Sequence, residues 1–254
     1  MSLAAVWRRA SFAILIGASA LLPGSAGAAD SIVTDANLVT GLDISDSVSA
    51  EYLRLELEGM AHAISSPEFL AAVQAGQSGR IGFAVFARHH NQFPQVVSWT
   101  LIASEQDART VARAIEARLL VDVEGEGRRS EVFYAGRLTD LSQAIDHAAL
   151  MLQTAPYAAR RAVINIIGNG EDNVGEDAQA ARDRAVEKGI IVNGVVLGTD
   201  PAMLDYYRRE IVGGPGAFVM WASNIAVMSD VMARKFQSDI VLDMRTDAAT
   251  ELNH

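Results

Sequence analysis

Apolar runs alternate with amphipathic stretches along most of this chain, and the two patterns predict different elements. Runs rich in apolar residues predict buried strands, which we place over residues 37–42, 80–87, 95–102, 162–167, 190–197 and 217–222. Apolar residues that recur at three- and four-residue steps predict helices. The first begins near Ser47, and the others cover residues 69–73, 104–120, 141–152, 177–188, 201–211 and 225–240. The short link between the second and third strands indicates an antiparallel hairpin, whereas intervening helices make the other strands parallel.

The order of these elements predicts the fold class. Strands that alternate with helices form an α/β fold, here with a doubly wound, mostly parallel central sheet, one antiparallel edge strand and helices on both faces, as in Rossmann-like proteins. One such domain is expected over residues 29–243. Residues 244–254 are largely polar and are expected to form a frayed tail.

The beginning of the chain has the pattern of an export signal. Two arginines precede an apolar run over residues 10–22 that is short for a membrane span, and residues 26–28 read Ala-Gly-Ala, a typical cleavage site. We therefore expect a signal peptide over residues 1–28 and a periplasmic or secreted protein after cleavage near Ala28, with an uncleaved membrane anchor as the alternative. No later run is apolar for long enough to form a transmembrane helix.

Charge and cysteine content narrow the range of partners. Removal of the leader takes away two arginines and no acids, so the net charge falls from −10 to −12. Phosphate binding needs clustered Lys and Arg, so we expect no nucleic-acid partner. The chain has no Cys, which excludes disulfides and a thiol nucleophile, and its stability must come from an ordinary hydrophobic core.

Ligands bind at the carboxyl ends of parallel strands, so the segments that follow the predicted strands are the places to search. The first strand ends in Asp43-Ile44-Ser45-Asp46-Ser47, which offers a carboxylate and two hydroxyl groups at alternate positions. These hard oxygen donors suit Mg²⁺, Mn²⁺ or Ca²⁺. The alternative interpretation is that Ser47 only caps the next helix.

Two later segments offer further oxygen donors at strand ends or helix starts. Thr139 stands just before a predicted helix, and Asn169 follows a buried strand in the turn over residues 168–173. Each also has a purely structural interpretation, since Thr139 can cap its helix and Asn169 tolerates the backbone angles of a turn.

The order of these three segments resembles the von Willebrand factor A domain, whose metal-ion-dependent adhesion site uses the same three loops. More closely, the chain resembles a family of exported bacterial A-type proteins of uncharacterised function. The stretches that carry this closer resemblance are residues 79–85, 96–102 and 206–219. The resemblance covers nearly the whole of the expected mature chain.

The resemblance implies a set of metal ligands. Asp43, Ser45, Ser47 and Thr139 would hold the ion directly or through water. The family pattern expects an Asp where this chain has Asn169, and an amide brings no negative charge. The resemblance therefore implies a site for Mg²⁺, Mn²⁺ or Ca²⁺ that is weakened, or one that holds no metal.

The resemblance further implies protein recognition, in which the metal leaves one position open for an acidic side chain of a protein partner. A metal-free interaction scaffold is the alternative. A metal-assisted hydrolase is disfavoured, because the chain lacks a thiol nucleophile, a Gly-x-Ser-x-Gly elbow and a phosphate-binding loop. We therefore expect an exported binding domain and no enzymatic activity.

We predict that the exported protein begins at or next to Ala29, because the small residues just before it fit the requirements of signal peptidase. Intact-mass measurement of the protein recovered from the periplasm or the medium checks this. A mass that still includes residues 1–28 would indicate the membrane anchor instead.

Overall fold

The computed structural model describes residues 31–43, 50–88, 93–123 and 139–251. Within these ranges one sheet has the strand order β3-β2-β1-β4-β5-β6. Its strands are β1 (Val33–Asp43), β2 (Ile81–Arg88), β3 (Gln95–Ile102), β4 (Ala158–Gly168), β5 (Ile190–Leu197) and β6 (Val219–Ala222). Every neighbouring pair is parallel except β2 and β3, which form an antiparallel hairpin at one edge. The predicted sheet is confirmed.

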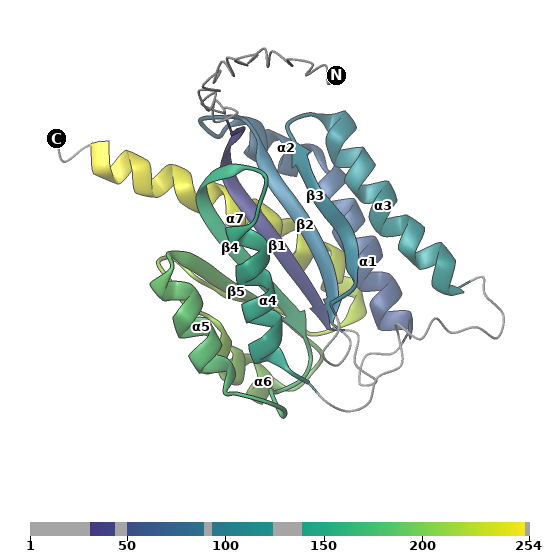
Figure 1. Cartoon of the computed structure of the whole chain (residues 1–254). Coiled ribbons are helices and arrows are strands. Elements are labelled where there is room, and N and C mark those ends of the chain that lie inside the picture. The colour runs from purple at the N-terminus through teal and green to yellow at the C-terminus, as the bar shows by residue number, and fades with distance from the viewer. Residues whose placement is uncertain (1–30, 44–49, 89–92, 124–138, 252–254) are drawn as a thin grey trace, which may run out of the picture. The chain divides into compact units, whose positions relative to one another are not determined.

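Helices cover both faces of this sheet (Figure 1). They are α1 (Ala50–Ser65), α2 (Pro67–Gln74), α3 (Glu105–Val123), α4 (Leu141–Gln153), α5 (Ala178–Glu187), α6 (Pro201–Tyr206) and α7 (Met228–Glu251), with a π-helix η2 (Tyr207–Ile211) and a 3-10 turn η3 (Ile225–Val227). One apolar core joins the sheet to α1, α3 and α7, and a second joins it to α4 and α5. We call these two sides the α1 face and the α4 face.

Alternation along the strands explains why both faces are apolar. In β2, Phe83 and Val85 belong to the core of the α1 face, whereas Ala84 and Phe86 belong to the core of the α4 face. A strand buried on both sides therefore reads as a continuous apolar run, which is why the sequence pattern locates it. In the part of the chain that is described, no helix is long and apolar enough to cross a membrane.

A fully buried polar network fastens α7 to the middle of the sheet. Lys235 forms an ion pair with Asp239 one helical turn later, and its Nζ also donates to Asn165 Oδ1 of β4 (2.6 Å). The carboxylate of Asp239 accepts from Asn165 Nδ2 (2.8 Å) and from Asn193 Nδ2 of β5 (3.0 Å). All four side chains have no exposed surface. Each charge in the network therefore has its partners inside the core, as burial requires.

Two elements near the end of the chain differ from their predictions. The helix predicted over residues 201–211 changes at Tyr207 into the π-helix η2. The side chain of Arg182 donates to the carbonyl oxygens of Arg209 (3.1 Å) and Val212 (2.8 Å), and so binds carbonyls at the end of this turn. α7 also continues to Glu251 through a stretch that contains no Gly or Pro, so residues 244–251 are helical where the sequence predicts a polar tail.

We predict that Lys235→Met lowers the free energy of unfolding by about 3 kcal/mol, because it leaves the Asp239 carboxylate buried without its cation. The double variant Lys235→Met/Asp239→Leu should recover only part of this loss, since it removes both charges but leaves the buried amides of Asn165 and Asn193 without these partners. Urea unfolding measures both effects.

The chain offers a matched control in Lys188, its only other lysine, which is exposed at the end of α5. Lys188→Met should change the free energy of unfolding by less than about 0.5 kcal/mol. A loss in Lys235→Met no larger than that of the control would contradict the anchoring role of the network.

Candidate functional site

Three strand ends lie side by side in the middle of the sheet. β1 ends at Asp43, β2 at Arg88 and β4 at Gly168. The register pairs Asp43 with Arg88, and one residue earlier it pairs Leu42 with Ile167. The chain segments that leave these strands therefore start from the same edge.

The boundary between β1 and β4 is where the chain connections diverge. β1 leads to α1 on one face, whereas β4 leads to α5 on the other. In an open parallel sheet, ligands bind outside the strand ends at such a point. We call the region formed by Asp43, Arg88, Thr139 and residues 168–173 the strand-end edge.

Thr139 is held against the loop after β4 by a pair of hydrogen bonds. Its backbone N–H donates to Asn173 Oδ1 (2.8 Å), and its carbonyl oxygen accepts from the Asn173 N–H (2.9 Å). Thr139 is buried, and a Cβ added to Gly170 would lie 3.2 Å from its Oγ1. Glycine at position 170 thus allows the loop backbone to approach the Thr139 hydroxyl. The structure brings Thr139 together with the turn that carries Asn169.

Asp140, rather than Thr139, caps α4. Asp140 Oδ1 accepts from the backbone N–H of Gln143 (2.9 Å) and from the Ser142 hydroxyl (2.9 Å). Thr139 lies one residue outside the helix cap, so the capping interpretation of this residue is wrong. Its position is instead set by the loop after β4.

Asp172 connects that loop to two helices. Its Oδ1 accepts from the Leu141 N–H at the start of α4 (2.8 Å), and its own N–H donates to the Tyr206 hydroxyl at the end of α6 (3.0 Å). Burial raises the pKa of Asp172 to about 6. The Leu141 hydrogen bond opposes this rise, the nearby carboxylate of Asp140 adds to it, and the positive charge of Arg88 opposes it.

The structure describes three of the five predicted ligands. Asp43 ends β1, Thr139 is buried beside α4, and Asn169 is half-buried directly after β4. Ser45 and Ser47 lie outside the described residues.

Sequence reasoning missed two features of the edge. The sequence pattern indicates only a polar turn at Asp172 and Asn173, whereas these residues hold the start of α4. It assigns no role to Arg88 at all. The signal that could have found this residue is an arginine that ends an otherwise apolar strand at the edge where ligands bind.

The donor chemistry fits a hard cation with little negative charge to hold it. Thr139 and Asn169 offer neutral oxygens, which suit Mg²⁺, Mn²⁺ or Ca²⁺, and Asp43 is the only carboxylate among the predicted ligands. Across the described ranges, no group of three or more His, Cys, Asp or Glu side chains could hold a metal ion.

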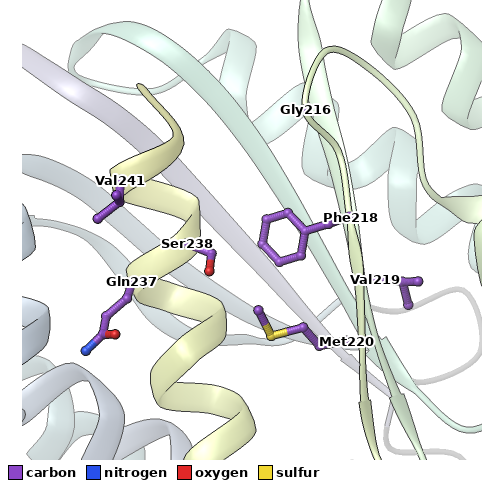
Figure 2. Close-up of a pocket in the computed structure, with 7 residues that line it drawn as sticks. All are labelled: Gly216, Phe218, Val219, Met220, Gln237, Ser238 and Val241. Atoms are coloured by element: carbon purple, nitrogen blue, oxygen red, sulfur yellow. The ribbon is translucent and has the colours of Figure 1, made fainter. Parts of the chain in front are cut away.

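Among the hollows of the described structure, two differ in their place relative to the strand-end edge. One of about 480 Å³ adjoins the strand-end edge, where Asp172, Tyr206 and Glu210 form part of its lining. The other, of about 530 Å³, lies between α7 and the chain around the start of β6 (Figure 2). It is lined by Gly216, Phe218, Val219, Met220, Gln237, Ser238 and Val241. Because β6 runs parallel to β5 and ends at Ala222, the second hollow lies away from the carboxyl ends of the strands.

Comparison with known proteins gives one family and a fold. A family model described as "Protein of unknown function (DUF1194)" matches residues 33–243. None of the curated proteins matches the chain.

Solved structures of von Willebrand factor A-domain proteins share the fold. Proximal thread matrix protein 1 from the mussel byssus, "with zinc occupied MIDAS motif", is 14% identical with a TM-score of 0.52, over 80% of this chain and 46% of that one. The pilus adhesin SpaC from Lactobacillus rhamnosus GG is 10% identical with a TM-score of 0.52, over 82% of this chain and 31% of that one. This chain thus spans less than half the length of either protein. Such low identities establish a von Willebrand factor A-like fold and nothing further.

We predict a pH dependence from Asp172. Because its pKa is raised in the folded state, its contribution to stability is full below about pH 4 and is lost as the pH rises to about 6. Asp172→Asn keeps an acceptor for Leu141 but cannot titrate. The free energy of unfolding of the variant, relative to wild type, should therefore rise between about pH 4 and 6 and then level off.

Urea unfolding across this pH range in EDTA measures the difference. Asp230→Asn makes the same chemical change at an exposed position of α7, away from the strand-end edge, and is the control. A difference between Asp172→Asn and wild type that does not change with pH would contradict the raised pKa.

Proposed function

The chain belongs to the family described as proteins of unknown function (DUF1194), and on this premise we propose that it is an exported protein-binding domain that recognises its partner with the strand-end edge. One observation carries this proposal. Thr139 and the loop after β4 are clamped together at the edge where β1 ends in Asp43, at the point where parallel sheets bind ligands.

We propose that this edge holds a divalent cation weakly. Asp43, Ser45, Ser47, Thr139 and Asn169 are the proposed ligands, directly or through water, for Mg²⁺, Mn²⁺ or Ca²⁺. The zinc-occupied MIDAS motif of the mussel byssus protein supports a divalent ion in a related fold. The ion would offer an open coordination position to an acidic side chain of the partner.

The charge of the domain supports a local positive anchor. With a net charge of −12 after removal of residues 1–28, which contain two arginines and no acids, the mature chain would repel an acidic partner at long range. A cation fixed at one edge would reverse this repulsion locally. Recognition would then depend on the charge balance of the strand-end edge.

A second candidate is a metal-free interaction scaffold, and Asn169 is the observation that favours it. The amide replaces the carboxylate that the family pattern expects after β4, and a site with one carboxylate among its ligands attracts divalent ions poorly. We propose a binding role, not catalysis, for both candidates, in the periplasm or outside the cell.

Affinity capture from an envelope extract tests the proposal. Immobilised wild type should retain a partner that Asp43→Ala loses, because the substitution removes the only carboxylate among the proposed ligands. Asp230→Ala, at an exposed position of α7, is the matched control and should retain the partner.

The same capture in EDTA separates the two candidates. A partner lost in EDTA indicates the cation site, whereas one that stays bound in EDTA but not to Asp43→Ala indicates the metal-free scaffold. Equal retention by wild type, Asp43→Ala and Asp230→Ala would place recognition elsewhere on the domain.

A further inference from the structure

Arg88 is a buried positive charge at the strand-end edge. It ends β2, whose other residues are all apolar, and its side chain is 3% exposed. The β1–β2 register is unbroken up to the pairing of Asp43 with Arg88, so the Cα atoms of these two residues lie about 5 Å apart. A guanidinium is permanently charged in proteins, and burying one at a strand end requires compensating groups around it.

The side chain of Arg88 lies on the α4 face of the sheet, where α4 begins. Alternation places it with Phe86, which belongs to the core of the α4 face and whose ring centroid lies 4.9 Å from that of His147 in α4. Thr139 and Leu141 at the start of α4 are on this face as well, and both bind the loop after β4. Arg88 and that loop thus meet the same end of α4.

Electrostatics agree with this placement. The positive charge of Arg88 lowers the pKa of Asp172, against the rise that burial causes. The guanidinium therefore lies within interaction range of the loop after β4. A carboxylate near Arg88 is stabilised, and a cation there is repelled. The edge thus contains a positive charge of its own where the family pattern expects a metal ion to supply one.

We propose that Arg88 is the built-in countercharge of the strand-end edge, and that with Asn169 it sets the affinity of this edge for divalent cations low. The inference rests on the proposed site, and it gives a physical reason for the weak cation binding proposed there. Asn169 removes one negative charge that a divalent ion would use, and Arg88 adds one positive charge that opposes the ion. The positive charge of Arg88 then balances negative charge at the folded edge. A divalent ion is not needed to offset the carboxylates there.

Calorimetric titration of Mg²⁺ into the mature protein tests the role of Arg88. Arg88→Gln should bind Mg²⁺ at least about tenfold more tightly than wild type, because removal of a unit charge near a divalent ion exceeds the ~1.4 kcal/mol that a tenfold change represents. Arg88→Lys keeps the charge and should bind as wild type does.

Arg80 provides the matched control, because it is an exposed arginine just before the start of the same strand. Arg80→Gln makes the same chemical change at the opposite end of β2, roughly 25 Å from Arg88, and should leave the Mg²⁺ affinity unchanged. Equal Mg²⁺ affinities in wild type and Arg88→Gln would overturn the proposal, and so would equal tightening by Arg80→Gln.

Loss of the buried Arg88 can also unfold the chain. In that case, the folding of Arg88→Gln with and without Mg²⁺ tests the proposal. If Arg88→Gln is unfolded in EDTA, it should regain its far-ultraviolet circular dichroism in millimolar Mg²⁺, because the ion would replace the missing charge. A variant that remains unfolded with Mg²⁺ would contradict the countercharge role. The Mg²⁺ titrations use no partner protein, so they are independent of the capture experiment. If Arg88→Gln binds Mg²⁺ more tightly but no partner is captured, the proposed function is disproved and the role of Arg88 stands.

Discussion

Parallel strands all end at the same edge of the sheet, and this constraint determines where the polar loop residues of the protein come together. Five of the six strands in the described sheet run the same way, and the connections from β1 and β4 leave toward opposite faces. Polar residues that are far apart in sequence, such as Asp43 and Thr139, therefore come to one edge. The clamp between Thr139 and Asn173 then fixes the start of α4 to the loop after β4. The proposed recognition at this edge would follow from sheet topology as much as from any single side chain.

The acidic chain uses buried cations to compensate carboxylates inside the fold. Lys235 neutralises Asp239 between α7 and the sheet, where Asn165 and Asn193 supply the remaining hydrogen bonds. Arg88 acts electrostatically on the half-buried Asp172 near the start of α4. Lys235 lies where an uncompensated carboxylate would cost several kcal/mol, because Asp239 is fully buried. The core network fixes α7 to the sheet, whereas we propose that the charge at the edge sets how strongly that edge attracts ions.

Local patterns predicted most of the fold, and long-range contacts explain the exceptions. The buried strands were found because they are apolar on both faces, and their mostly parallel direction followed from the helices between them. Arg182 stabilises the π-turn after Tyr206 from another helix, a contact that no local pattern contains. At the candidate site, Thr139 and Asn169 were predicted from their places beside a helix and a strand. The roles of Arg88 and Asp172 arise from neighbours distant in sequence, so spacing alone did not indicate them.

The central claim is that the strand-end edge, with its charge set by Arg88 and Asn169, is where this domain meets a cation and its partner. Paramagnetic broadening of backbone amide signals by substoichiometric Mn²⁺ tests it most directly, because it locates even a weakly bound ion. The amides of Thr139, Asn169 and Gly170 should broaden first, and more strongly in Arg88→Gln than in wild type. Broadening that begins along exposed acids of α7, or beside the hollow at β6, in both proteins would contradict the account.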